Sequence, residues 1–235
     1  MIAAVACTPQ TPLLLPGLGG RPVPEIDRLR DAAAGAVTFL LEQEVDEVIV
    51  VGAARSTGPH PADAPDPTAR LAPAPGRRSV PGELPVPLAV ARSLLAGCDM
   101  PWSLYGAAQD AGPEVHRDLG APLGRRPGRG GLLVAADGSA CRTEKAPGYF
   151  DPRALGLDQR IVTALRDGDV SGLAALDPEA CRDLLVSGRA AWHVMAGACE
   201  GGRWLARMPY EDDPFGVAYW VATWLRCDGE PRAPL

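Results

Sequence analysis

A length of 235 residues suits one large domain or two small ones, and we expect a single domain over 1–235. The net charge of -6 excludes a nucleic-acid surface of clustered Lys and Arg, so we expect no nucleic-acid partner. Hydrophobic residues make up 46% of the chain, but no apolar run approaches the length of a membrane span, so we expect no membrane partner.

The first half of the chain predicts a strand, a helix and a second strand. Residues 2–7 are apolar and small, which is typical of a strand buried on both faces. Over residues 24–44 the apolar side chains recur at helical spacing, and Pro24 suits the first helical position. Residues 48–52 form a β-branched apolar run, as in a parallel strand inside a sheet. This order indicates an α/β crossover unit.

The segment over about 53–86 is rich in proline and predicts no regular element. A structureless run of this length inside a domain is usually a functional flap or disordered, so we expect a Pro-rich loop or flap there. A short helix over 87–96 and a strand over 102–106 are predicted next. Residues 107–130 are expected to be mostly loop.

The stretch after residue 130 opens with an apolar run that breaks into Asp137, Gly138 and Ser139. A buried strand that ends in an acid and a hydroxyl is a common way to present a ligand site, because ligands bind beyond strand ends in α/β proteins. An Asp-Gly turn would use the same residues for backbone reasons alone. Further elements are predicted in the rest of the chain: helices over 151–167, 178–185 and 188–199, and strands over 203–206 and 217–225.

The six cysteines are scattered, with no C-x-x-C pair. This spacing is typical of reduced thiols and not of a zinc ribbon or a disulfide framework. The start, MIAAVACTPQTPLLLPG, has no basic leader, and prolines break its apolar runs. We therefore expect a cytoplasmic protein.

Three stretches resemble the class III extradiol ring-cleavage dioxygenases, in the catalytic-subunit (LigB-like) fold shared with Memo-like proteins. PQTPLLLPGLGG is similar to the family's proline-rich opening. LLVAADGSACRTEKAPGYFDPRALGLDQRIVTAL is similar to its strand, Asp-x-Ser-His-Arg motif, Gly-Tyr-Asp-Pro loop, and the Asp and helix that follow. PYEDDPFGVAYWVA is similar to its closing strand. The resemblance implies an α/β fold: a three-layer α/β/α sandwich around a mostly parallel or mixed central sheet.

The resemblance also places the metal-ligand positions of the family on this chain. These enzymes hold Fe(II) with two His and a carboxylate, and a further His acts as acid and base. The corresponding positions here carry other side chains: Gln10, Ala54 or Arg55, Ala140, and the pair Ser187-Gly188. Because these side chains cannot form a facial triad, we expect no metal and no cofactor.

The first hypothesis is therefore a dioxygenase-like protein that has lost its Fe(II) site and kept a small-molecule pocket at the strand ends. Gln10, Arg55, Asp137, Ser139 and Arg142 would line that pocket. Arg55 in a former metal position suits an anionic ligand, because its guanidinium fork replaces the charge of the cation.

A second hypothesis is an active metal-dependent extradiol-type dioxygenase, or a related oxidoreductase or hydrolase. Fe(II) would then be held by a rebuilt site that combines His60, His116 or His193 with Asp137. Whether the protein is an enzyme stays open at this point.

Two further hypotheses need no metal. In one, Cys141 or Ser139 is a nucleophile that follows Asp137. In the other, the chain is a protein-interaction module that docks through residues 53–86. Members of the family often assemble into oligomers, so the resemblance implies a homodimer.

Overall fold

The computed structural model describes residues 1–18, 23–70 and 81–227. Its centre is one mixed sheet with the strand order β3-β4-β2-β5-β1-β7-β6. The strands are β1 (Ile2–Thr8), β2 (Glu47–Ala54), β3 (Gly58–His60), β4 (Trp102–Ala108), β5 (Gly130–Ala135), β6 (Trp204–Asp212) and β7 (Tyr219–Arg226). Strands β1, β2, β4 and β5 run parallel to one another, while β3, β6 and β7 pair antiparallel with their neighbours.

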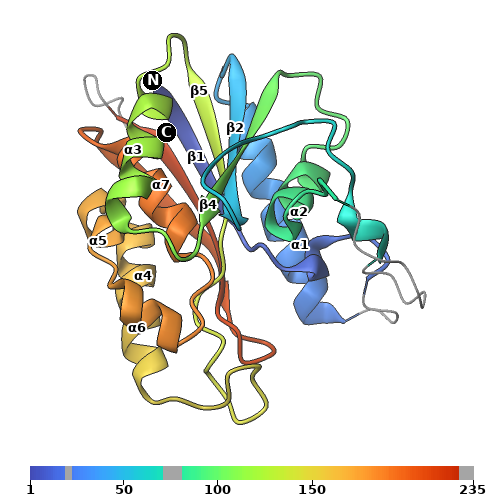
Figure 1. The fold of residues 1–235 in the computed structure, drawn as a ribbon, viewed down its shortest axis with the longest axis vertical. Coiled ribbons are helices and arrows are strands. Elements are labelled where there is room, and N and C mark those ends of the chain that lie inside the picture. Colours follow the sequence, from blue (N-terminus) through green and yellow to red (C-terminus); the bar gives the residue numbers. More distant parts are fainter. Residues whose placement is uncertain (19–22, 71–80, 228–235) are drawn as a thin grey trace.

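Helices cover both faces of this sheet. They are α1 (Pro24–Leu41), α2 (Val86–Leu94), α3 (Pro113–Gly124), α4 (Arg153–Asp167), α5 (Val170–Ala174), α6 (Pro178–Asp183) and α7 (Arg189–Cys199). Figure 1 shows α1 and α2 on one side of the sheet and α3 to α7 on the other. The predicted α/β sandwich around a mixed central sheet is therefore confirmed.

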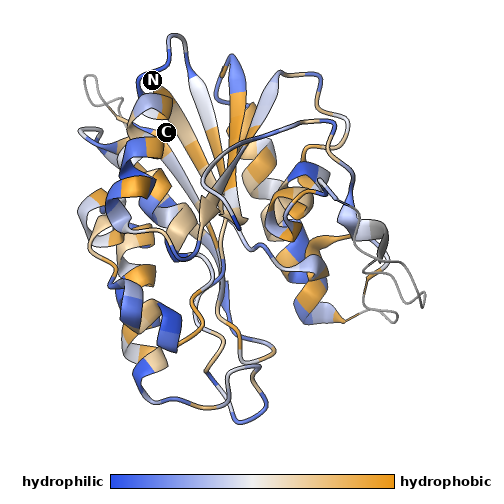
Figure 2. Cartoon of the chain, in the orientation of Figure 1, coloured by the Kyte–Doolittle hydropathy of each residue, from blue (hydrophilic) through white to orange (hydrophobic). Residues whose placement is uncertain are grey.

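Each face of the sheet has its own apolar core. Alternate residues of a strand point to opposite faces, so Val5 packs under α7 while Ala4 and Ala6 pack under α1. The central strands β1, β2 and β5 are buried on both faces, which explains their unbroken apolar runs. In Figure 2 the hydrophobic colours gather on the sheet and on the inner faces of the helices.

Helix α3 was not predicted, because residues 107–130 are rich in glycine and proline. Those glycines serve helix packing. A Cβ on Gly120 would lie 2.1 Å from the Val194 carbonyl oxygen, and one on Gly124 would lie 2.1 Å from the Ala198 carbonyl oxygen. Contact with α7 offsets the low helix propensity of glycine. The expectation of loop over this range was wrong for Pro113–Gly124.

The Pro-rich segment is also more structured than predicted. It contains β3, which pairs with β4, and a 3-10 helix over Pro67–Arg70, and α2 begins at its end. Residues 71–80 of the predicted loop lie outside the described residues. The helix α5 was likewise not predicted, because five residues are too few to show a helical period.

Two further expectations concern the whole chain. All six cysteines are free, and four of them are buried. Within the described ranges, no helix combines the length and the apolar character that crossing a bilayer requires.

A matched pair of glycine substitutions tests the packing at the end of β5. A Cβ on Gly138 would lie 2.4 Å from the indole of Trp220, so Gly138→Ala should lower the free energy of unfolding by on the order of 2 kcal/mol. Gly156 lies in α4 with open space around its Cα, so Gly156→Ala should raise it by about 0.5–1 kcal/mol. Urea unfolding measures both. Equal effects of the two substitutions would contradict this packing.

Candidate functional site

The parallel strands place the residues that follow them along one edge of the sheet. Gln10 follows β1, Arg55 follows β2, and Asp137 follows β5, which lies between those two strands. This edge is where ligands bind in open α/β sheets, so it is the natural place to look for a site.

Asp137 is the acid at this edge whose pKa is shifted most. Only 8% of it is exposed, and one of its carboxylate oxygens accepts a hydrogen bond of 2.9 Å from the main-chain N–H of Gln10. Burial raises the pKa of Asp137 to about 7, against the opposing effect of the Gln10 N–H. The side-chain oxygen of Gln10 is buried and makes no hydrogen bond among the described residues.

Ser139 is fully buried and serves an internal contact. Its N–H and its hydroxyl donate to the two carboxylate oxygens of Asp158, over 3.0 and 2.5 Å. Asp158 projects from α4, and Arg142 lies 3.5 Å from it. Arg142 also donates from Nε to Asp213 over 2.8 Å. Ser139 and Arg142 therefore hold α4 and the β6–β7 turn onto the end of β5.

The main chain around Asp137 connects two further segments. The Asp137 carbonyl accepts from the N–H of Gly188, at the start of α7. The Gly138 N–H donates to the Ala218 carbonyl, and the Ala218 N–H donates to the Ser139 carbonyl. A Cβ on Gly188 would lie 2.7 Å from the Asp137 carbonyl oxygen. The polar stretch after β5 is thus a structural junction.

Arg55 lies in a different setting, a hollow of about 570 Å³ beyond the end of β2. Ser56 and His60 share the wall, and residues 81–86 close the opposite side. Arg55 is exposed, and its guanidinium forms no hydrogen bond or ion pair with any residue that the structure describes. Glu83, across the hollow, already has a polar contact of its own.

His60 has a fixed place in this hollow because β3 lies against β4. A Cβ on Gly106 would lie 2.5 Å from Nε2 of His60, so the imidazole covers a position that must stay glycine. Burial lowers the pKa of His60, which keeps the ring neutral near pH 7. Arg55 is then the cation among the described residues that line this hollow.

The five predicted site residues therefore divide among three settings. Gln10 contacts Asp137, Ser139 and Arg142 share the Asp158 network, and Arg55 faces the separate hollow. The structure does not bring all five around one cavity.

The donor set does not fit the Fe(II) that the family resemblance implies. In the described part of the chain, no three His, Cys, Asp or Glu side chains converge as metal ligands would. The rings of His116 and His193 lie 5.8 Å apart on α3 and α7, and Asp137 does not join them. His60 lies on β3, the strand at one end of the sheet, beside β4.

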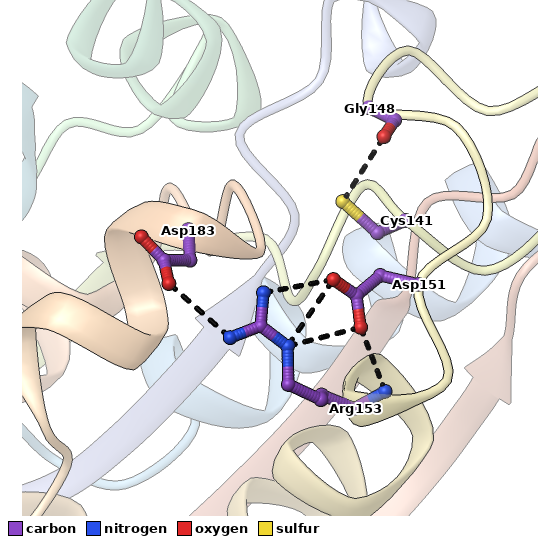
Figure 3. A network of polar contacts seen from close by, with 5 residues as sticks. All are labelled: Cys141, Gly148, Asp151, Arg153 and Asp183. Atoms are coloured by element: carbon purple, nitrogen blue, oxygen red, sulfur yellow. Dashed lines mark hydrogen bonds and ion pairs between the residues drawn. The ribbon is translucent and has the colours of Figure 1, made fainter.

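The Cys141 thiol is buried and close to the Gly148 carbonyl, with 3.7 Å between sulfur and oxygen. Burial raises the pKa of Cys141, so the thiol stays protonated at neutral pH. Figure 3 shows the neighbouring Arg153 held between the carboxylates of Asp151 and Asp183. This geometry suits a packed side chain and gives no support to a nucleophile.

Sequence reasoning missed Asp158, the acid that anchors Ser139. Its signal was available: it lies on the apolar face of a predicted helix, between Leu157 and Ile161. A carboxylate at such a position is buried only when it is hydrogen-bonded, so it needs partners from another segment.

Comparisons with known proteins bear on the fold alone. No protein family matches the chain, and no curated protein does. Among solved structures, uncharacterized protein JW3007 from Escherichia coli K12 is 14% identical, with a TM-score of 0.51. The match covers 95% of this chain and 99% of that one. This likeness agrees with the α/β sandwich.

The buried acid gives a pH-dependent prediction. Because the pKa of Asp137 rises from 3.8 to about 7 on folding, the folded protein keeps a proton that the unfolded chain loses. Stability should therefore fall as the pH rises from about 4 to about 7. Asp137→Asn keeps an acceptor for Gln10 and should escape this loss, so above pH 7 it should be the more stable by up to about 4 kcal/mol.

Urea unfolding at several pH values measures this difference. Asp31→Asn, an exposed carboxylate on α1, controls for the change in net charge. A constant gap between wild type and Asp137→Asn from pH 4 to pH 8 would contradict a buried Asp137 that titrates near neutrality.

Proposed function

We propose that this protein is a binding protein on a dioxygenase-like scaffold, without the Fe(II) site, and that it takes a small anionic molecule at the carboxyl ends of its strands. The observation that carries the proposal is Arg55, a guanidinium without an ionic partner among the described residues, in a hollow of about 570 Å³. A volume of this size is ordinary for a small-molecule site.

The chemistry of the hollow favours a carboxylate or a phosphate. A guanidinium presents N–H donors in a planar fork that matches two oxygens of either group. The Ser56 hydroxyl and a neutral His60 can each add a hydrogen bond. Leu84 and Val86 supply an apolar wall for the rest of the ligand.

The expected affinity is modest. Arg55 is exposed, and an ion pair open to solvent contributes roughly 0.2–1 kcal/mol. Specificity therefore depends on the wall contacts as well as on the charge. A cytoplasmic location and a homodimeric assembly belong to the same proposal. The scattered free cysteines support the first, and the family resemblance supports the second.

Loss of the Arg55 guanidinium should weaken anion binding measurably. We expect benzoate and inorganic phosphate to bind wild type in a saturable titration followed by NMR, with shifts at Arg55 and His60. Arg55→Ala should weaken both by up to about fivefold, while Arg55→Lys keeps part of the affinity.

Arg207→Ala is the matched control, since Arg207 is an exposed arginine on β6, away from the hollow. It should leave the titration unchanged. Equal weakening by Arg55→Ala and Arg207→Ala would indicate a net-charge effect only and would remove the support for this site.

A further inference from the structure

His60 lines the same hollow as Arg55 and is half-buried there. It lies opposite Leu104 of β4, on the face of the sheet that packs under α2. Tyr105, the next residue of β4, points to the other face and contacts Arg126. Neither nitrogen of the His60 ring forms a hydrogen bond or an ion pair with the residues that the structure describes. Part of the ring is therefore accessible to a ligand in the hollow.

Charged side chains line this hollow from two segments of the described chain. Arg55 follows β2, and Glu83 lies across the hollow in the segment before α2, with a polar contact of its own. Outside the lining, Asp66 pairs with Arg92 over 2.9 Å, and Asp63 is exposed to solvent. Burial lowers the pKa of the imidazole, and none of these carboxylates contributes to the shift. Among the described residues, the ring therefore has no anionic partner.

An anion bound beside His60 changes the protonation of the ring. Because its pKa is lowered, the ring is neutral at pH 7 before an anion binds. A negative charge nearby stabilises the imidazolium and so raises the pKa of His60. This effect grows with the charge of the ligand, and it is strongest for a group that carries two charges, such as a sulfate or a phosphate ester. The Arg55 guanidinium balances one of these charges, which leaves the second for the imidazolium.

We propose that this hollow takes up a proton on His60 when it binds its ligand, and that the ligand is a small dianion of the sulfate or phosphate-ester type. The inference rests on the proposed function, because an anion must first bind at Arg55. The guanidinium and the imidazolium then lie in one hollow and balance the two charges of the ligand. The proton belongs to the bound state, so the affinity for a dianion rises as the pH falls through neutrality, and the affinity for a monoanion rises less.

Sulfate and methanesulfonate are a matched pair of probes, because both are tetrahedral and neither changes its charge between about pH 5.5 and about pH 8. NMR titration of the full chain at constant ionic strength should give a sulfate affinity about five- to tenfold higher at the lower pH, since one unit of pKa change on binding corresponds to a tenfold change in affinity. The affinity for methanesulfonate should change by less than about threefold. Saturating sulfate should raise the pKa of His60, followed by its ring resonances, by about one unit.

His60→Gln keeps a hydrogen-bonding group in the hollow but cannot take up the proton, so its sulfate affinity should stay constant across the same pH range. Asp137→Asn is the matched control. Asp137 has a pKa of about 7 at the same edge of the sheet but does not line the hollow, so this variant should keep the pH profile of the wild type. Should His60→Gln fail to fold, the effect of sulfate on the His60 resonances of the wild type still decides the question.

The possible failures of this inference and of the proposed function can be told apart. Absence of saturable binding by sulfate, methanesulfonate and benzoate alike would overturn both. Sulfate binding that Arg55→Ala weakens, but that is constant over the pH range, would overturn proton uptake alone, and so would a pH profile that survives in His60→Gln or disappears in Asp137→Asn. Benzoate binding without sulfate binding, or equal pH dependence of sulfate and methanesulfonate, would overturn the assignment to dianions and leave the anion site itself in place.

Discussion

The stretch Asp137–Gly138–Ser139 is the contact on which this edge of the sheet depends. It joins the loop after β1 through the Gln10 N–H, the start of α7 through Gly188, and α4 through Asp158. Its hydrogen bonds to Ala218 add β7 to the same junction. The polar groups of a buried segment must find hydrogen-bond partners inside the protein. Asp137 and Ser139, which resemble catalytic residues in the sequence, therefore hold the surrounding elements together.

Because Asp137, Gly138 and Ser139 hold elements together, they are not available as ligands for a metal. Where the dioxygenase resemblance implies ligands for Fe(II), the chain has a main-chain hydrogen bond at Gln10 and an internal network at Ser139. Among the described residues, Arg55 presents an unpaired charge beyond the end of β2, in a hollow beside His60. In the proposed function, the Arg55 guanidinium faces an anion where a metal would need neutral imidazoles and a carboxylate.

The sequence predicted most elements because their signals are local. The apolar runs of β1 and β2 and the stripe Ile26, Leu29, Ala33 of α1 follow strand and helix periods directly. Helix α3 escaped because Gly120 and Gly124 serve a contact with α7 that no local pattern shows. Likewise, Ser139 and Arg142 belong to one motif of the sequence, but their partners Asp158 and Asp213 come from other segments, which no local pattern shows.

Metal stoichiometry after anaerobic incubation with Fe(II) and desalting tests the central claim most directly. If the polar stretch after β5 is a structural junction, the bound iron should stay far below one equivalent per chain. His60→Ala and His116→Ala should not change the amount of iron that remains bound. Retention of one Fe(II) per chain that is lost in Asp137→Asn would contradict the account.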